Sequence, residues 1–145
     1  MLNQIGKLVI MTGLMSSYFF AIPAAAEAWK LRNDKGLVIF SLDAAPFDLT
    51  LVCDPEGAFI PPQIYMLVDI NGKRLESGVL EVAQGDHTVR LNVEHFAIVP
   101  ARPDFEWNTA TRLLFGGGTL MLKAGARERS LELRAVQGNP CLTRG

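Results

Sequence analysis

Residues 47–54 read Phe-Asp-Leu-Thr-Leu-Val-Cys-Asp, and this alternation of apolar and polar side chains predicts a half-buried β-strand. Successive side chains of a strand point to opposite faces. The core face would therefore carry Phe47, Leu49, Leu51 and Cys53. This places the sulfur of Cys53 inside the protein, while the only other cysteine, Cys141, lies near the C-terminus. The rest of the chain must fold so that the segment around Cys141 can reach this strand.

Cys53 and Cys141 are expected to form a disulfide. Paired cysteines are typical of exported proteins, because disulfides persist in oxidising compartments. The bridge would tie the C-terminal tail to the end of the strand. The alternative is two free thiols, one buried and one on a loose tail. A zinc site needs more ligands than two cysteines and two scattered histidines supply, so we expect neither a bound metal nor a cofactor.

The N-terminus has the three parts of a secretory signal peptide: a positive charge at Lys7, an apolar run over residues 8–22, and small residues at 23–26. Cleavage between Ala26 and Glu27 would complete its removal. The alternative is an uncleaved membrane anchor, but the apolar run is shorter than the roughly 20 residues that a spanning helix needs. We therefore expect a periplasmic or secreted protein without a stable membrane anchor after cleavage.

Removal of residues 1–26 would leave residues 27–145, which is the size of one small domain. Of the 14 basic residues only Lys7 lies in the signal segment, whereas all 15 acidic residues follow it. The mature chain would therefore be slightly acidic, with both signs of charge interspersed. This distribution argues against nucleic acid and against anionic membranes as partners.

Further stretches alternate in the same way, among them residues 63–70 and 88–94. Between two of them, Asn71-Gly72 predicts a tight hairpin turn. We interpret residues 73–82 as its return strand, with a bulge at Gly78 where the inward parity changes. About seven to nine short strands predict an all-β fold, either a small antiparallel β-sandwich or a partly open barrel.

One short helix is predicted near residues 107–115, within Phe105 to Gly116, with Asp104 or Asn108 as its cap. The run Gly116-Gly117-Gly118 then predicts a flexible linker. A phosphate-binding loop is disfavoured, because the glycines follow the helix and lack a Gly-Lys-Ser/Thr ending.

Two irregular segments are candidates for a binding surface, because binding residues concentrate on loops held by a rigid scaffold. The first follows Cys53, and its candidate residues are Asp54, Glu56, Phe59 and Ile60. The second combines aromatic side chains with arginine, a composition typical of binding hot spots, and its candidates are Arg102, Phe105 and Trp107. The alternatives are an ordinary connection held by Asx turns and an aromatic plug that closes one end of the sheets.

Catalytic residues are harder to find in this sequence. His95 continues the inward parity of its strand, so we expect it on the core side, but no Gly-x-Ser-x-Gly elbow supplies a nucleophile. The function we expect is a non-enzymatic exported protein that binds a protein or another component of the cell envelope. Two alternatives are a small envelope hydrolase that uses His95 with a carboxylate, and a structural subunit of an envelope assembly.

Overall fold

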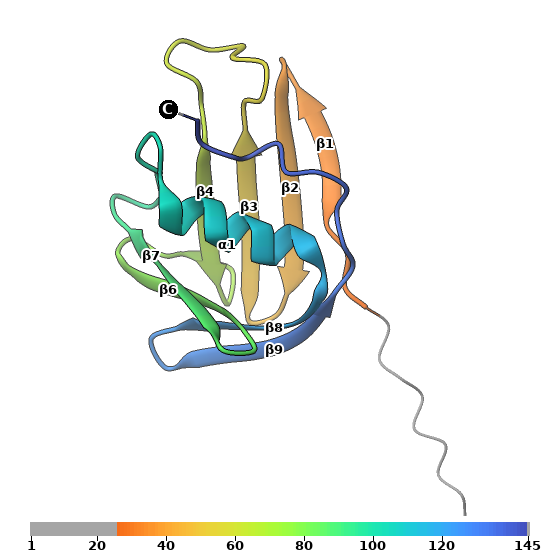
Figure 1. Cartoon of the computed structure of the whole chain (residues 1–145). Coiled ribbons are helices and arrows are strands. Elements are labelled where there is room, and N and C mark those ends of the chain that lie inside the picture. Colours follow the sequence, from red (N-terminus) through yellow and green to blue (C-terminus); the bar gives the residue numbers. More distant parts are fainter. Residues whose placement is uncertain (1–25, 145) are drawn as a thin grey trace, which may run out of the picture.

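The computed structural model describes residues 26–144. The expected signal segment therefore lies, apart from Ala26, outside the described residues. Within residues 26–144 the chain forms nine strands and one helix (Figure 1). In chain order these are β1 (Lys30–Asp34), β2 (Leu37–Ala44), β3 (Phe47–Cys53), β4 (Tyr65–Ile70), β5 (Lys73–Arg74), β6 (Gly78–Gln84), β7 (His87–Val93), α1 (Phe105–Gly116), β8 (Gly118–Ala124) and β9 (Arg127–Leu133).

The strands form two antiparallel sheets, and this confirms the predicted fold class. The five-stranded sheet has the order β1-β2-β3-β4-β5, and the four-stranded sheet has the order β7-β6-β8-β9. Figure 1 shows α1 crossing in front of the five-stranded sheet, with the four-stranded sheet beside it. The helix and the smaller sheet thus together cover one face of the larger sheet.

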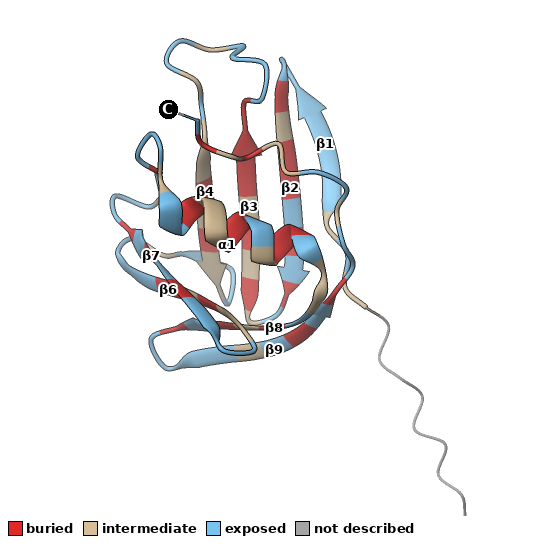
Figure 2. Ribbon diagram, in the orientation of Figure 1, coloured by how far each residue is buried: buried red, intermediate tan, exposed pale blue. Residues whose placement is uncertain are grey.

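The core lies between these layers, and Figure 2 shows buried positions in both sheets and in α1. In strands such as β7 and β9 the apolar side chains alternate with polar ones, so that the apolar side chains are buried and their polar neighbours remain at the surface. The largest fully buried side chains come from both sheets and from α1, and include Phe47, Leu49, Leu51, Met66, Leu80, Leu122, Trp107 and Phe115.

The interpretation of residues 73–82 as one return strand is wrong. β5 pairs with β4 in the larger sheet, whereas β6 pairs with β7 and β8 in the smaller sheet. The change of inward parity near Gly78 therefore marks the passage of the chain from one sheet to the other. Gly78 has a φ of 142°, a conformation that glycine adopts without strain and that suits this change of direction.

The helix begins as predicted, because the carboxylate of Asp104 accepts a hydrogen bond from the backbone N–H of Trp107 over 2.9 Å. The glycines after it do not form the expected flexible linker. Gly117 has a φ of 76°, and a Cβ atom there would lie 2.8 Å from the backbone nitrogen of Ala135. Gln84 also donates to the carbonyl oxygen of Gly117 over 3.0 Å. Glycine is needed here for close packing between segments.

Candidate binding surface

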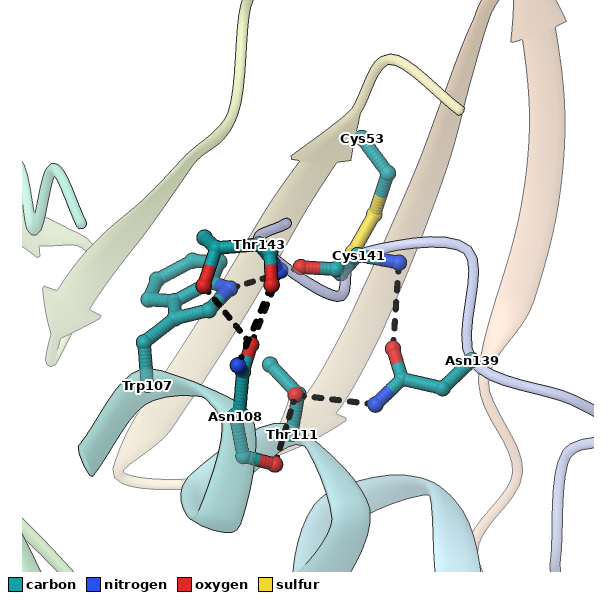
Figure 3. Close-up of a disulfide and its surroundings, with 7 residues drawn as sticks. All are labelled: Cys53, Trp107, Asn108, Thr111, Asn139, Cys141 and Thr143. Carbon is teal, nitrogen blue, oxygen red and sulfur yellow. Dashed lines mark hydrogen bonds between the residues drawn. A yellow bond between two sulfur atoms is a disulfide. The ribbon is translucent and has the colours of Figure 1, made fainter. Parts of the chain in front are cut away.

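Cys53 and Cys141 form the predicted disulfide (Figure 3). Their Cα atoms are 4.8 Å apart and both residues are completely buried. Cys53 is the last residue of β3, so the bridge fixes the C-terminal tail over one end of the larger sheet. A disulfide in this position is compatible with an oxidising compartment.

The tail is also fixed to α1 by hydrogen bonds (Figure 3). The indole N–H of Trp107 donates to the carbonyl oxygen of Cys141 over 2.7 Å. Asn108 exchanges hydrogen bonds with Thr143: its Nδ2 donates to the Thr143 carbonyl over 3.2 Å, and its Oδ1 accepts from the Thr143 amide over 2.8 Å. Asn139 accepts from the amide of Cys141 over 3.0 Å. The tail is therefore an ordered part of this end of the molecule.

Trp107 was predicted on the binding surface, but that position is wrong because its side chain is completely buried. It lies beneath the tail, where its ring closes one end of the core and its N–H reaches Cys141. Helical periodicity explains the difference between Trp107 and its neighbour Phe105. Phe105, at the first position of α1, points away from the core and is 76% exposed.

Asp54 organises the loop that follows β3. Its carboxylate accepts hydrogen bonds from the backbone N–H groups of Ala58, Phe59 and Gln63, over 2.6, 3.1 and 3.1 Å. Burial alone would raise the pKa of Asp54, but these three donors and the nearby guanidinium of Arg102 outweigh burial and hold that pKa below its ordinary value. The carboxylate of Asp54 therefore holds the loop together. A partner would be contacted by other residues of the loop.

Phe59 and Ile60 have opposite environments although they are adjacent in the loop. Phe59 is half-buried and packs, with Tyr65, on a small apolar cluster on the outer face of the larger sheet, formed by Leu37, Ile39 and Val52. Ile60 is 98% exposed. The loop is therefore anchored through Phe59 and presents Ile60 to solvent.

The two segments predicted to bind lie side by side. The guanidinium of Arg102 donates a hydrogen bond to the carbonyl oxygen of Pro62 at the end of the first loop. A groove of about 350 Å³ lies at this junction, and its lining includes Glu56, Arg102 and Arg144. Of the seven predicted surface residues, the structure places Asp54, Glu56 and Arg102 around this groove.

A second groove, of about 710 Å³, lies between β7 and the start of α1. Its lining includes Asn92, Glu94, Val99 and Glu106, which sequence reasoning did not single out. Val99 is 70% exposed. The alternation of residues 88–94 places Asn92 and Glu94 on the polar face, but no local signal joins them to Val99 in an irregular segment and Glu106 in the first turn of α1.

His95 lines this second groove and is exposed, so its expected position on the core side is wrong. β7 ends at Val93, and Glu94 pairs with Ala97 across a two-residue turn made by His95 and Phe96. Both turn residues have positive φ, 51° and 69°, which is uncommon for residues other than glycine. The strand parity therefore stops two residues before His95.

The second groove has few of the groups that catalysis requires. Its lining contains no Ser, Thr or Cys that would act as a nucleophile beside His95. Within residues 26–144, no set of three or more His, Cys, Asp and Glu side chains is arranged to hold a metal ion. The helix in that range, α1, is not long and apolar enough to cross a membrane.

Comparison of the chain with protein-family models, with curated proteins and with solved structures finds no match. The function must therefore be argued from the geometry of this end of the molecule.

Proposed function

We propose that this protein is an exported, non-enzymatic binding protein, active in the periplasm or outside the cell. Its partner is a protein or another component of the cell envelope. The binding surface comprises Glu56, Ile60, Val99, Arg102 and Phe105, and the name "loop surface" is used for these five residues below.

The observation that carries this proposal is that rigid loops hold large apolar side chains in solvent. Ile60, Val99 and Phe105 are 98%, 70% and 76% exposed. The backbone beside each of them is held: Asp54 accepts from the amides of Phe59 and Gln63 on either side of Ile60. Ile98, next to Val99, exchanges hydrogen bonds with Met66, and Asp104 caps the helix that begins at Phe105. Exposed apolar groups on an ordered framework are typical of interaction sites, because little conformational entropy is lost on binding.

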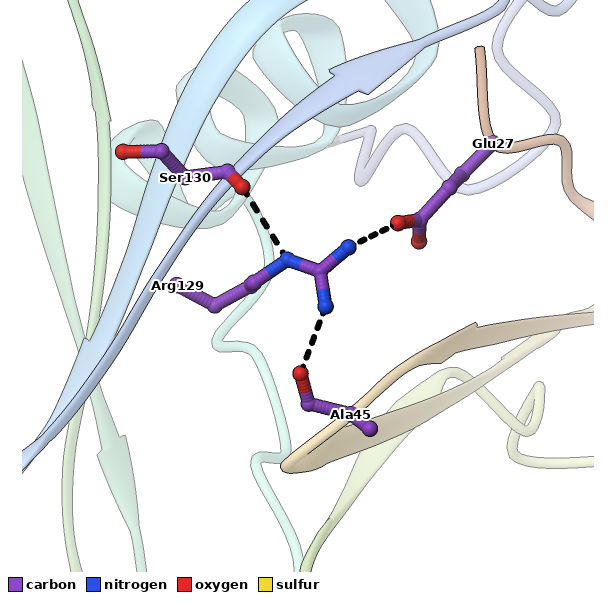
Figure 4. A network of polar contacts seen from close by, with 4 residues as sticks. All are labelled: Glu27, Ala45, Arg129 and Ser130. Carbon is purple, nitrogen blue, oxygen red and sulfur yellow. Dashed lines mark hydrogen bonds and ion pairs between the residues drawn. The ribbon is translucent and has the colours of Figure 1, made fainter. Parts of the chain in front are cut away.

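The contacts of Glu27 are compatible with cleavage after Ala26. The amide of Glu27 donates to the carbonyl oxygen of Glu132 over 2.8 Å, and its own carbonyl accepts from Arg134 over 2.9 Å. Its carboxylate pairs with the guanidinium of Arg129, which also donates over 2.7 Å to the carbonyl oxygen of Ala45 in the turn between β2 and β3 (Figure 4). A mature chain that begins at Glu27 would keep all of these contacts.

Photo-crosslinking in the native envelope tests the proposal. A photoreactive phenylalanine analogue is placed at Ile60 or at Phe105 in the exported protein. The control carries it at Leu31, which is 60% exposed but lies on the edge strand β1. We expect discrete crosslinked products from positions 60 and 105 and none of the same size from position 31. Equal products from all three positions, or none from either loop position, would contradict the proposal.

Three serine substitutions separate binding from stability. Ile60→Ser and Phe105→Ser remove exposed apolar groups, so we expect the crosslinks to weaken while the unfolding midpoint changes little. Phe59→Ser removes an anchoring side chain and should lower the midpoint.

A further inference from the structure

Within residues 26–144, no strand lies beside the outer edge of β7. Among the described strands β7 pairs only with β6, and it forms the end of its sheet. The direction of its backbone groups follows from the two turns at its ends. His87 faces Gln84 across the two-residue turn that joins β6 and β7, whereas Glu94 bonds to Ala97 on the opposite side.

N–H and C=O groups of successive residues in a strand point to opposite sides. Since Glu94 exchanges backbone hydrogen bonds with Ala97 over 2.9 and 3.2 Å, the backbone groups of Asn92, Arg90 and Thr88 point to that same outer side. No backbone hydrogen bond from the described residues reaches these three. The chain leaves this edge after Ala97, because Ile98 pairs with Met66 of the larger sheet.

The groove of about 710 Å³ lies along this unpaired edge. Three consecutive residues of β7, Arg90 to Asn92, contribute to its lining. Consecutive side chains of a strand lie on opposite faces, so a space that touches all three must run past the strand edge and not over one face. The opposite side of the groove carries Val99 and the first turn of α1.

The groove has an excess of negative charge. Glu94 and Glu106 are exposed, and among the described residues neither takes part in an ion pair. The one guanidinium in the lining, on Arg90, is paired with Glu81 of the neighbouring strand over 2.8 Å. A partner with positive side chains would therefore be favoured over a neutral or acidic one.

We infer that this groove binds an extended, positively charged polypeptide segment, which adds to the edge of β7 as a further strand. The segment's backbone pairs with Thr88, Arg90 and Asn92, its lysine or arginine side chains lie near Glu94 and Glu106, and its apolar side chains contact Val99. The inference rests on the proposed binding function, because it names the kind of partner segment that this end of the molecule takes.

A labelled peptide of alternating lysine and valine, with blocked ends, serves as the probe for the full mature protein. We expect it to bind, and a peptide of alternating glutamate and valine to bind at least about tenfold more weakly. The double variant Glu94→Gln, Glu106→Gln should bind the lysine peptide about three- to tenfold more weakly. Glu128→Gln, which removes an exposed carboxylate on β9 at the opposite edge of the same sheet, should bind it normally.

Strand addition has two signatures that simple charge attraction lacks. N-methylation of one alternate set of peptide amides should abolish binding, while methylation of the other set should have a small effect. Bound peptide should also slow amide exchange at Arg90 and Asn92, but not at Asn33 in the edge strand β1, whose backbone groups also point away from the neighbouring strand. Equal effects of the two methylations, or protection at β1 instead, would overturn the inference.

Failure of strand addition can be distinguished from failure of the proposed binding function. Crosslinks from Phe105 together with absent peptide binding would overturn strand addition and leave the binding function in place. Peptide binding with both signatures, but no crosslinks from Ile60 or Phe105, would support the groove and contradict the loop surface.

Discussion

The indole N–H of Trp107 and the carbonyl oxygen of Cys141 are joined by a buried hydrogen bond of 2.7 Å. The bond links the first turn of α1 to the disulfide-bound tail, across 34 residues of sequence. Helix, tail and larger sheet therefore meet at one point, directly beneath the segments that carry the loop surface. Stability at this point and order in the loops should be coupled.

Trp107→Phe removes that hydrogen bond and leaves the buried carbonyl of Cys141 without its partner. We expect the free energy of unfolding to fall by about 1–3 kcal/mol, measured by urea denaturation. Trp29→Phe is the matched control: its indole also donates to a carbonyl, that of Leu114 over 3.1 Å, but from a half-buried position. A smaller loss in Trp107→Phe than in the control would contradict the assigned role.

Reduction of the disulfide should release the tail. The bridge joins residues 88 positions apart, and by the chain-entropy model a loop of this length stabilises a fold by about 4–5 kcal/mol. We therefore expect a large drop in the denaturation midpoint when a reductant is added. A Cys53→Ala, Cys141→Ala double variant should show the lower midpoint with and without reductant. An unchanged midpoint in the wild-type protein would contradict the prediction.

Much of the fold follows from local patterns. Apolar alternation identified the strands around Phe47–Cys53, Asn71-Gly72 identified a hairpin, and Asp104 marked the helix start, because each of these signals depends only on nearby residues. The pairing of Cys53 with Cys141 followed from there being two cysteines in the chain. These features did not require knowledge of tertiary contacts.

The remaining features depend on contacts distant in sequence. Alternation indicates which face of a strand is apolar but not which sheet the strand joins. The sequence therefore did not predict that β5 and β6 belong to different sheets. The turn at His95 and Phe96 contains neither glycine nor asparagine, and a positive φ there was therefore not expected. The free edge of β7 emerges only once all strands have been assigned partners.

Asp54→Asn should destabilise the loop that carries Ile60. An uncharged amide has one acceptor oxygen for the three N–H groups that the carboxylate now accepts, so we expect a loss of about 1–3 kcal/mol at neutral pH. Because the folded pKa of Asp54 is lowered, its contribution is present above the unfolded value near 3.8 and disappears as pH falls through the folded value.

The measurement is a series of urea denaturations from pH 7 down to about pH 2. The difference in the free energy of unfolding between wild type and Asp54→Asn should become smaller below about pH 4. Glu56→Gln, an exposed carboxylate on the same loop, should differ little from wild type over the whole range. A constant difference at every pH would show that the charge of Asp54 does not hold the loop.

Asp48 presents the opposite case on the outer face of the larger sheet. Asp48 lies directly opposite Asp43 on one side and Asp69 on the other, so three carboxylates form a row across β2, β3 and β4. Partial burial raises the pKa of Asp48, and the negative charges of Asp43 and Asp69 raise it further. Like charges directly opposite one another destabilise a sheet.

Because the folded pKa of Asp48 is raised, its favourable contribution is complete below the unfolded value near 3.8 and is lost as pH rises through the folded value. Asp48→Asn should therefore be more stable than wild type at pH 7, and the gain should shrink as the pH approaches 3.8. Thermal denaturation of both proteins at pH 7 and at acidic pH measures the gain in stability and its decrease. Asp34→Asn, at an exposed position opposite Leu37, is the control and should change neither midpoint appreciably. A loss of stability in Asp48→Asn at pH 7 would mean that the carboxylate makes a favourable contact that outweighs repulsion by its two neighbours.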